Sequence, residues 1–274
     1  MNVEYGKTSA PDKPLVSIIT VCLNSEKHLE QTIKSVIGQT YQNIEYIIID
    51  GGSIDGTLDI IKKYQSRIAY RVSEPDRGLY DAMNKGIARA QGDLVGIINS
   101  DDYYQPDAVE IIVKEFLKDN EAGVFSGELL FFVDEPKSRI QWRRRLAGLG
   151  TFGQEIVHPA MFVKKEIYWK FKYDLRYKLE ADVDFVYNLC FNGVKFHTCP
   201  DLIAAFRVGG ISKSYRSLID GFMIRHKYFG LKFLPRNMAI LFVRSINWSI
   251  KKFILKNNFS HPLLKWYRKR RNLI

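Results

Sequence analysis

A short apolar run that ends in two adjacent acidic residues is the feature that most constrains this chain. Residues 94–98 are Leu-Val-Gly-Ile-Ile, which has the length and branched content of a buried strand in a parallel sheet. Asn99-Ser100-Asp101-Asp102 follows it without any turn residue. Because open α/β sheets bind ligands at the carboxyl ends of their strands, we expect both carboxylates at a sheet edge, facing a crevice.

Two adjacent carboxylates can serve a ligand or the fold. In a partly desolvated site they repel each other unless a cation or hydrogen-bond donors keep both ionised. Oxygen ligands of this kind suit Mg²⁺ or Mn²⁺ carrying a phosphorylated substrate. An Asp before Pro106 is also typical of a helix N-cap. Taken alone, the pair favours the cap, so the rest of the chain has to decide.

Apolar runs and helical patterns alternate through the first half of the chain. The runs at residues 16–21, 44–50 and 68–72 predict strands, and residues 26–39, 57–64 and 79–90 predict helices. In the first helix, Leu29, Ile33, Val36 and Ile37 share one face. Strands that alternate with helices form right-handed parallel crossovers, so the fold class is α/β with a nucleotide-binding type of sheet.

The segment after the second predicted strand is rich in glycine. Asp50 stands at the carboxyl end of that strand, and Gly-Gly-Ser-Ile-Asp-Gly follows at residues 51–56. An Asp at this place can accept a hydrogen bond from a nucleobase or ribose, and the glycines permit close approach of the backbone. An ordinary turn capped by Asp55 or Thr57 explains the same residues, because a Gly-rich turn alone is a weak signal.

Five motifs occur together and in one order. They are Thr20-Val-Cys-Leu-Asn24, Ser35-Val-Ile-Gly-Gln-Thr-Tyr41, residues 45–57, residues 73–102 and Ala181-Asp-Val-Asp184. Together they resemble the inverting family-2 glycosyltransferases with the GT-A fold, especially the bacterial branch that builds cell-surface polysaccharides. The resemblance covers residues 15–211, about three quarters of the chain. It implies a mostly parallel, Rossmann-like sheet flanked by helices. It also implies transfer of a sugar from a nucleotide-sugar, by analogy a UDP-sugar, to a hydroxyl of a saccharide or lipid-linked saccharide.

The resemblance also assigns donor-side residues. Those expected to cradle the nucleoside are Thr20, Val21, Asn24 and Asp50, and those expected beside the nucleotide are Asp76 and Arg77. Asp101 is then the ribose contact and Asp102 the ligand of Mg²⁺ or Mn²⁺. One departure is Ile54, where the family usually has Thr, and this puts only a minor turn hydrogen bond in doubt.

The acceptor side is expected to hold the general base. An inverting transfer needs one carboxylate within hydrogen-bond reach of the acceptor hydroxyl, which loses its proton as it attacks the anomeric carbon. The resemblance assigns this role to Asp182, and the further candidates on this side are Glu180, Asp184, His158 and Arg207. Helix capping by the three acids, a buried structural histidine and a solvated strand-end arginine explain the same residues without function.

The positive charge of the chain is concentrated after residue 211. Residues 212–274 contain fifteen Lys or Arg and a single acidic residue, Asp220, whereas the whole chain has a net charge of +11. Residues 238–255 predict a basic amphipathic helix that suits an anionic membrane surface. Packing of its apolar face on the catalytic domain is the alternative. We therefore divide the chain into a tail at 1–14, a catalytic domain at 15–211 and a basic helical extension at 212–274.

Other classes of protein fit less well. A sugar-phosphate nucleotidyltransferase would show a Gly-rich phosphate loop with a basic residue near the first strand, and residues 20–25 have neither. A membrane-binding or nucleic-acid-binding protein with a non-catalytic nucleotide site is a further alternative, although no nucleic-acid motif is present and no nucleic acid is expected as a partner. Three cysteines without metal-ligand spacing and a polar start of the chain favour a cytoplasmic protein, peripheral to the inner face of the cell membrane.

Overall fold

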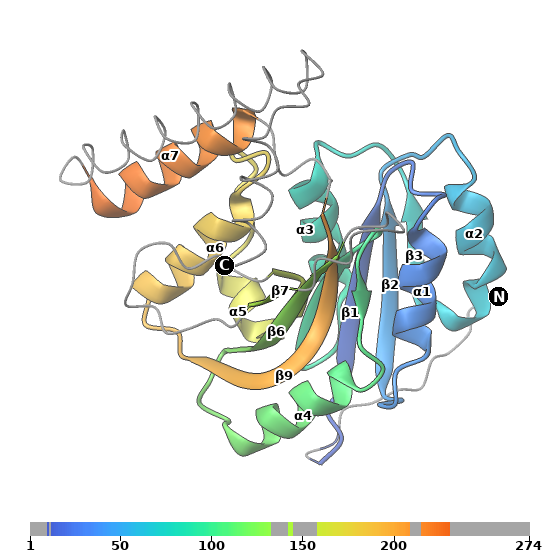
Figure 1. The fold of residues 1–274 in the computed structure, drawn as a ribbon, viewed down its shortest axis with the longest axis horizontal. Helices are drawn as coiled ribbons and strands as arrows, with labels where there is room; N and C mark the ends of the chain where they lie inside the picture. Colours follow the sequence, from blue (N-terminus) through green and yellow to red (C-terminus); the bar gives the residue numbers. More distant parts are fainter. Residues whose placement is uncertain (1–9, 11, 133–141, 145–157, 209–214, 231–274) are drawn as a thin grey trace, which may run out of the picture. The chain divides into compact units, whose positions relative to one another are not determined.

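One mixed sheet organises the part of the chain that the structure describes. The computed structural model describes residues 10, 12–132, 142–144, 158–208 and 215–230. Within these residues nine strands form a sheet in the order β3-β2-β1-β4-β8-β6-β9-β5, and β7 pairs with β6 (Figure 1). The chain divides into two compact units, residues 1–221 and 222–274, and the sheet belongs to the first. No helix of the described residues is long and apolar enough to cross a membrane.

The first four strands are parallel, as the alternating pattern predicts. They are β1 (Val16–Cys22), β2 (Ile44–Asp50), β3 (Tyr70–Ser73) and β4 (Leu94–Asn99). In the sheet β1 lies between β2 and β4. All seven residues of β1 are buried. Such a strand is covered on both faces, which explains why its sequence is an apolar run and not an alternation of apolar and polar residues.

Helices cover both faces of this parallel half. The helices are α1 (Leu29–Ile37), α2 (Thr57–Lys63) and α3 (Leu79–Arg89), and a 3₁₀ turn, η1 (Gln65–Arg67), follows α2. Ile18 of β1 shares a core cluster with Leu29 and Ile33 of α1. Its neighbour Ile19 meets α3, where a Cβ on Gly86 would lie 2.5 Å from the Ile19 Cγ2 atom. Gly86 therefore lets α3 approach the sheet closely.

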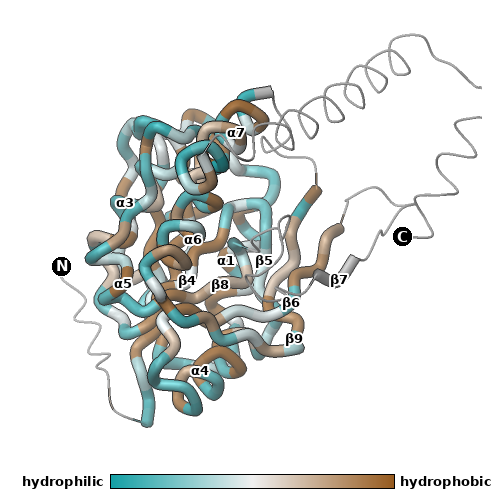
Figure 2. Tube along the Cα trace, turned by 90° about the vertical axis from the view of Figure 1, so that its left-hand side faces the viewer, coloured by the Kyte–Doolittle hydropathy of each residue, from teal (hydrophilic) through white to brown (hydrophobic). Residues whose placement is uncertain are grey.

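The second half of the sheet is mixed. After β4 the next strand in the sheet, β8, is antiparallel to it, β6 is antiparallel to β8, and β9 is parallel to β6. Figure 2 shows apolar stretches of β4 and β8 lying inside, among the helices. The remaining elements are β5 (Tyr103–Tyr104), α4 (Ala108–Lys118), β6 (Val124–Phe132), β7 (Trp142–Arg144), η2 (His158–Ala160), β8 (Met161–Lys164), α5 (Lys165–Lys170), α6 (Ala181–Phe191), β9 (Phe196–Arg207) and α7 (Tyr215–Phe229).

The parallel register brings four polar strand ends to one edge of the sheet. Cys22 at the end of β1 pairs with Asp50, and Asp50 pairs with Ser73 at the end of β3. On the other side of β1, Val21 pairs with Asn99 at the end of β4. The strand order reverses between β1 and β4, and this is the position at which open α/β sheets bind their ligands.

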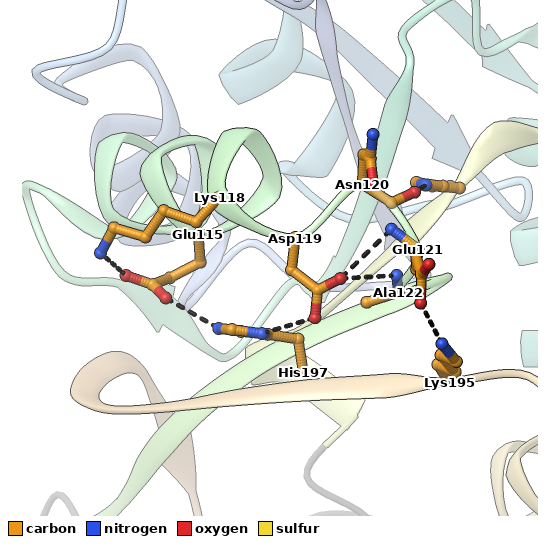
Figure 3. A network of polar contacts seen from close by, with 9 residues as sticks. Glu115, Lys118, Asp119, Asn120, Glu121, Ala122, Lys195 and His197 are labelled. Carbon is orange, nitrogen blue, oxygen red and sulfur yellow. Dashed lines mark hydrogen bonds and ion pairs between the residues drawn. The ribbon is translucent and has the colours of Figure 1, made fainter.

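A polar network joins α4 to β9 (Figure 3). His197 of β9 lies between two carboxylates, with its Nε2 atom 2.7 Å from Glu115 and its Nδ1 atom 3.0 Å from Asp119. Burial alone would lower the pKa of His197, but the hydrogen bonds and charges of both carboxylates outweigh it and raise the pKa. The network therefore fixes the C-terminal end of α4 to the start of β9.

The first two turns of α7 belong to the same compact unit as the sheet. The Asp220 side chain is fully buried, and its Oδ2 atom accepts the backbone N–H groups of Lys178 and Leu179 at 2.7 and 2.9 Å. The Ser217 hydroxyl also contacts the Glu180 carboxylate. This unit therefore extends ten residues beyond 211, where we divide the sequence, to Gly221. The predicted helix at 238–255 lies outside the described residues.

Candidate active site

The turn after β4 gives its two carboxylates different surroundings. Asp101 is partly exposed, whereas Asp102 is 1% exposed. The Oδ1 atom of Asp102 accepts the backbone N–H of Arg207 at 2.9 Å, and its carbonyl accepts the Thr32 hydroxyl at 2.6 Å. Burial, and then the charge of Asp101, raise the pKa of Asp102 well above its ordinary value. We expect both carboxylates to face a crevice, but Asp102 instead ties this turn to β9.

Arg207 is held directly against this turn. Its Nε atom donates to the Asp101 carbonyl at 3.0 Å, and its Nη2 atom donates to Gln31 of α1 at 2.8 Å. The guanidinium also lies 4.5 Å from the centre of the Phe132 ring. Only 8% of the residue is exposed. Arg207 is therefore not a solvated strand-end side chain. It holds the Asp101 backbone through the hydrogen bond to its carbonyl.

The atoms at this turn fit a hard divalent cation. They are oxygen donors, and one of them, the Oδ1 atom of Asn99, is buried with no hydrogen-bond partner among the described residues. Mg²⁺ commonly takes one or two protein carboxylates and completes its shell with water and substrate phosphates. Accordingly, such a site does not need a larger cluster of ligands. In the described part of the chain, no three His, Cys, Asp or Glu side chains gather in a way that could hold a metal.

The Asp50 carboxylate organises the Gly-rich turn. Its two oxygens accept hydrogen bonds from the backbone N–H groups of Gly52 and Ser53 and from the hydroxyls of Ser53 and Ser73. Asp50 is fully buried, and burial alone would raise its pKa. The hydrogen bonds from the two serines outweigh burial and lower the pKa of Asp50 below its ordinary value. The carboxylate is therefore ionised, and its oxygens are occupied by donors from the Gly-rich turn and from the ends of β1 and β3.

The end of β1 supports the same loop. Thr20 is buried, and its hydroxyl lies 3.0 Å from the Tyr46 hydroxyl, while Val21 is 2% exposed. Neither side chain is therefore accessible to a ligand. Asn24 has a φ of 49°, in the left-handed region. Its Oδ1 atom accepts the N–H of Ile54 at 3.0 Å, so Asn24 fixes the outer part of the Gly-rich turn.

The segment that begins α3 brings a carboxylate and a cation to this edge. The Asp76 carboxylate lies against Gly51, where a Cβ would be 3.0 Å from its Oδ2 atom, and accepts the Lys85 ammonium at 2.5 Å. Arg77 has a largely exposed side chain that contacts the Asp81 carboxylate at 3.0 Å. The backbone N–H and then the side chain of Arg77 lower the pKa of Asp81. Because a guanidinium has five N–H donors, Arg77 keeps donors for an anionic ligand.

Asp182 lies in the first turn of α6, as the predicted motif requires. It is partly exposed, and its Oδ1 atom accepts the Tyr80 hydroxyl at 2.7 Å. The neighbouring acids differ from it. Asp184 is buried, and Glu180 is the residue before α6, with its side chain against Ser217. Of the three acids that we name for the base, Asp182 is the one that has an accessible carboxylate and is held by a side chain of α3, that of Tyr80.

His158 is a buried part of the same region. It is 6% exposed, and its Nε2 atom lies 2.8 Å from the Tyr173 hydroxyl. Burial lowers the pKa of His158, although the charge of Asp182 opposes this change. The histidine is therefore neutral and packs among aromatic side chains, which agrees with the structural alternative for this residue.

Sequence reasoning missed two residues that shape the site. Tyr80 follows Asp76 and Arg77 in the same motif, and a polar-tipped aromatic at the start of a helix beside two predicted ligand contacts is a usable signal. Asp220 is the one acidic residue in a strongly basic segment of the sequence. Its isolation among cations could have indicated a buried structural carboxylate.

Known proteins resemble this chain in sequence and in fold. Residues 17–186 match the family described as Glycosyl transferase family 2. An uncharacterised glycosyltransferase of Mycobacterium tuberculosis (strain CDC 1551 / Oshkosh) is 37% identical over 181 residues, which are 63% of this chain and 68% of that protein. A putative teichuronic acid biosynthesis glycosyltransferase, TuaG of Bacillus subtilis, is 37% identical over 125 residues, 44% of this chain and 50% of TuaG.

Two solved structures share the fold at low sequence identity. Staphylococcus aureus TarS 1-349 in complex with UDP-GlcNAc has a TM-score of 0.66 at 16% identity and covers 78% of this chain. The present chain covers 65% of that structure, slightly less than two thirds of its length. The mannosyltransferase PcManGT from Pyrobaculum calidifontis, in complex with GDP-Man and Mn²⁺, has a TM-score of 0.63 at 17% identity over 99% of this chain and 84% of that one. These likenesses confirm the predicted GT-A fold, and the family match covers more than half of the sequence, so this chain belongs to glycosyl transferase family 2.

Proposed function

We propose that this protein is an inverting glycosyltransferase that moves a sugar from a nucleotide-sugar to a hydroxyl group of an acceptor. The observation that carries the proposal is the start of α3. In this segment the Asp76 carboxylate lies against Gly51 of the Gly-rich turn, the Arg77 side chain is largely exposed, and Tyr80, three residues further on, donates a hydrogen bond to Asp182 of α6. One short segment thus joins a site for an anionic donor to an accessible carboxylate.

The related structures support a nucleotide-sugar as the donor, because TarS is described with UDP-GlcNAc and PcManGT with GDP-Man. In this chain the nucleoside would lie beyond the carboxyl end of β1, against Asn24 and the turn that Asp50 organises. Asp76 would be the carboxylate closest to it, since Asp50 has no oxygen left for a ligand. By family analogy we propose a UDP-sugar, and GDP- and dTDP-sugars are the alternatives that the experiment below includes.

A divalent cation, Mg²⁺ or Mn²⁺, is part of the proposal. The PcManGT complex contains Mn²⁺, and the oxygen donors after β4 of the present chain fit such an ion. We propose Asp101, not Asp102, as the carboxylate that reaches the cation, because Asp102 is buried and bonded to β9. A cation there would offset the negative charge of the donor diphosphate. Asn99 is the second side chain close enough in sequence to contribute an oxygen.

The residues of the chain then perform a single displacement. The Asp182 carboxylate accepts the proton of the acceptor hydroxyl while that oxygen forms the new bond to the anomeric carbon. The bond from the anomeric carbon to the diphosphate oxygen breaks with its electron pair, and Arg77 donates hydrogen bonds to the leaving diphosphate. Attack opposite the leaving group inverts the anomeric configuration. Positioning and charge stabilisation supply the catalysis.

The acceptor and the cellular setting are inferred by analogy. TuaG is named for teichuronic acid biosynthesis, and other relatives are named chondroitin synthase and hyaluronan synthase. These names support a saccharide or lipid-linked saccharide acceptor and a role in surface polysaccharide biosynthesis. We propose that the basic extension, residues 212–274, contacts the anionic inner face of the membrane, because it carries fifteen Lys or Arg and one acidic residue.

The first experiment measures release of nucleoside diphosphate from UDP-, GDP- and dTDP-sugars by the full chain, with and without Mn²⁺ and with candidate acceptors. We expect one donor to be turned over, and Asp182→Asn to retain donor binding by calorimetry while transfer is lost. Full transfer by Asp182→Asn would overturn the assignment of the base. No binding of any nucleotide by the wild-type protein would overturn the proposed function as a whole.

Membrane association has a separate test. Flotation with anionic and with zwitterionic vesicles compares the full chain with a protein that ends at Gly230 and so keeps the α7 contacts to residues 178–180. We expect binding to anionic vesicles by the full chain only. Equal flotation of both proteins would contradict the proposal.

A further inference from the structure

The hydrogen bond between Tyr80 and Asp182 joins two parts of the chain that lie 102 residues apart. Tyr80 is 5% exposed, whereas Asp182 is partly exposed. The Tyr80 hydroxyl donates to the Oδ1 atom of Asp182 at 2.7 Å. Among the described residues, no side chain donates to the Oδ2 atom. One carboxylate oxygen is therefore fixed and the other is available to a ligand.

The Tyr80 ring has little freedom to move. Its centroid lies 5.4 Å from that of Tyr173. The backbone of Tyr173 is itself bonded to α3, because the Asn84 side chain donates to its carbonyl at 2.9 Å and accepts its N–H at 3.2 Å. The close approach of Gly86 to Ile19 fixes α3 on the sheet. The hydroxyl is thus presented to Asp182 from a rigid support.

Tyr80 keeps its proton near neutral pH and so remains a hydrogen-bond donor there. Burial raises the pKa of Tyr80 well above its ordinary value, and the negative charge of Asp182 and the hydrogen bond donated to it raise it further. A phenol that keeps its proton next to a carboxylate can orient that carboxylate without competing with it for the proton of the acceptor.

The backbone that leads into α6 is fixed by different residues. Asp220 of α7 accepts the N–H groups of Lys178 and Leu179, and the Glu180 side chain contacts Ser217. Removal of the Tyr80 hydroxyl would therefore release the Asp182 carboxylate, while the backbone of residues 178–180 stays fixed. This separation allows an effect on the base to be distinguished from an effect on the fold.

We propose that Tyr80 is a positioning residue for the general base, which holds Oδ1 of Asp182 so that Oδ2 faces the acceptor hydroxyl. The inference rests on the proposed function of Asp182. It adds that the residues proposed to bind the donor, Asp76 and Arg77, are linked to the general base. Tyr80, which holds Asp182, lies only three residues after Arg77. A donor that orders Arg77 would thereby also steady the base before the acceptor binds.

The test is Tyr80→Phe in the full-length protein, since this change keeps the ring and removes only the hydroxyl. The matched control is Tyr64→Phe, because Tyr64 also donates to a carboxylate, Glu30, at 2.6 Å, but on the α1–α2 side of the sheet. We expect kcat of Tyr80→Phe to fall about 10- to 100-fold, the range in which a misplaced catalytic group acts. Donor affinity by calorimetry and the thermal midpoint should match those of the control.

A double-mutant cycle with Asp182→Asn separates a positioning role from a structural one. If Tyr80 acts only through Asp182, adding Tyr80→Phe to Asp182→Asn leaves the residual turnover unchanged. A further drop in turnover, or a loss of donor affinity in Tyr80→Phe, would show a structural role and overturn the inference. So would unchanged kcat in Tyr80→Phe while Asp182→Asn is inactive. Full activity of Asp182→Asn would instead overturn the base assignment and, with it, this role of Tyr80.

Discussion

Replacement of Asp50 tests whether this carboxylate builds the nucleotide-side turn. It accepts hydrogen bonds from the N–H groups of Gly52 and Ser53, from the hydroxyls of Ser53 and Ser73, and a weaker one from the Cys22 thiol. Ser73 is exposed, so its hydroxyl can turn to water, whereas Ser53 is 7% exposed and Asp50 is fully buried. The groups that lose a partner in Asp50→Ala are therefore the hydroxyl and N–H of Ser53 and the N–H of Gly52.

The cost follows from these three groups. A hydrogen bond contributes about 1 kcal/mol net, and more when the acceptor is charged or a buried donor is left unpaired. Asp50→Ala should thus lower the free energy of unfolding by about 3 to 5 kcal/mol. Asp50→Asn keeps one carbonyl oxygen, which can accept both N–H groups, and its amide can donate to the Ser53 hydroxyl. We expect that variant to lose about 1 to 2 kcal/mol.

The pH dependence gives an independent check. Because the folded pKa of Asp50 is lowered, its ionised form stabilises the protein above the unfolded pKa of about 3.9, and this contribution disappears as pH falls through the folded pKa. The stability gap between wild type and Asp50→Asn should therefore be full near neutral pH and shrink on acidification.

Urea unfolding near neutral pH and at a pH below about 3.9 measures both effects. Asp59→Ala, an exposed acid in the first turn of α2, is the matched control and should change stability by less than about 1 kcal/mol. If Asp50→Ala were as mild as this control, water or other acceptors would satisfy the turn, and the reasoning about Asp50 would be refuted.

Three further predictions concern other parts of the fold. Gly86→Ala should lower the free energy of unfolding in urea by about 1 to 2 kcal/mol, because the added methyl would overlap Ile19. The cost of this overlap should exceed the gain in helix propensity. A more stable variant would contradict this packing. The raised pKa of His197 means that its ion pairs stabilise the folded state fully below about pH 6.5 and progressively less as pH rises through the folded pKa. The unfolding free energies of wild type and His197→Gln should therefore converge on going from about pH 6 to about pH 9, and a constant difference would exclude a charged histidine. Asp101→Asn should weaken Mn²⁺-dependent binding of nucleoside diphosphate at unchanged thermal midpoint. Asp102→Ala, which removes the buried acceptor of the Arg207 N–H, should instead lower the thermal midpoint, and the reverse pattern would return the metal to Asp102.

The sequence by itself determined the parallel half of the sheet and the carboxyl-end positions of its polar residues. A strand covered on both faces must be apolar throughout, and an intervening amphipathic helix must return the chain to a parallel neighbour, so the four strands and three helices of residues 16–99 are readable from local pattern. The family motifs carried the rest of the functional prediction, because they are short and continuous in sequence. Asp182 lies at the start of α6, as its motif predicts.

Only the tertiary structure decided what those polar side chains contact. The sequence shows Asp101 and Asp102 as equivalent neighbours, but a register in which Arg207 of β9 bonds Asp102 buries one carboxylate and leaves the other accessible. Likewise, Tyr80 and Asp182 meet only because the fold brings the first turns of α3 and α6 together, although the two residues lie 102 positions apart in the sequence. Such contacts depend on loop closure and on packing between distant segments, for which no local period or propensity exists. The hydrogen bond that holds Asp182 is therefore visible only in the folded chain.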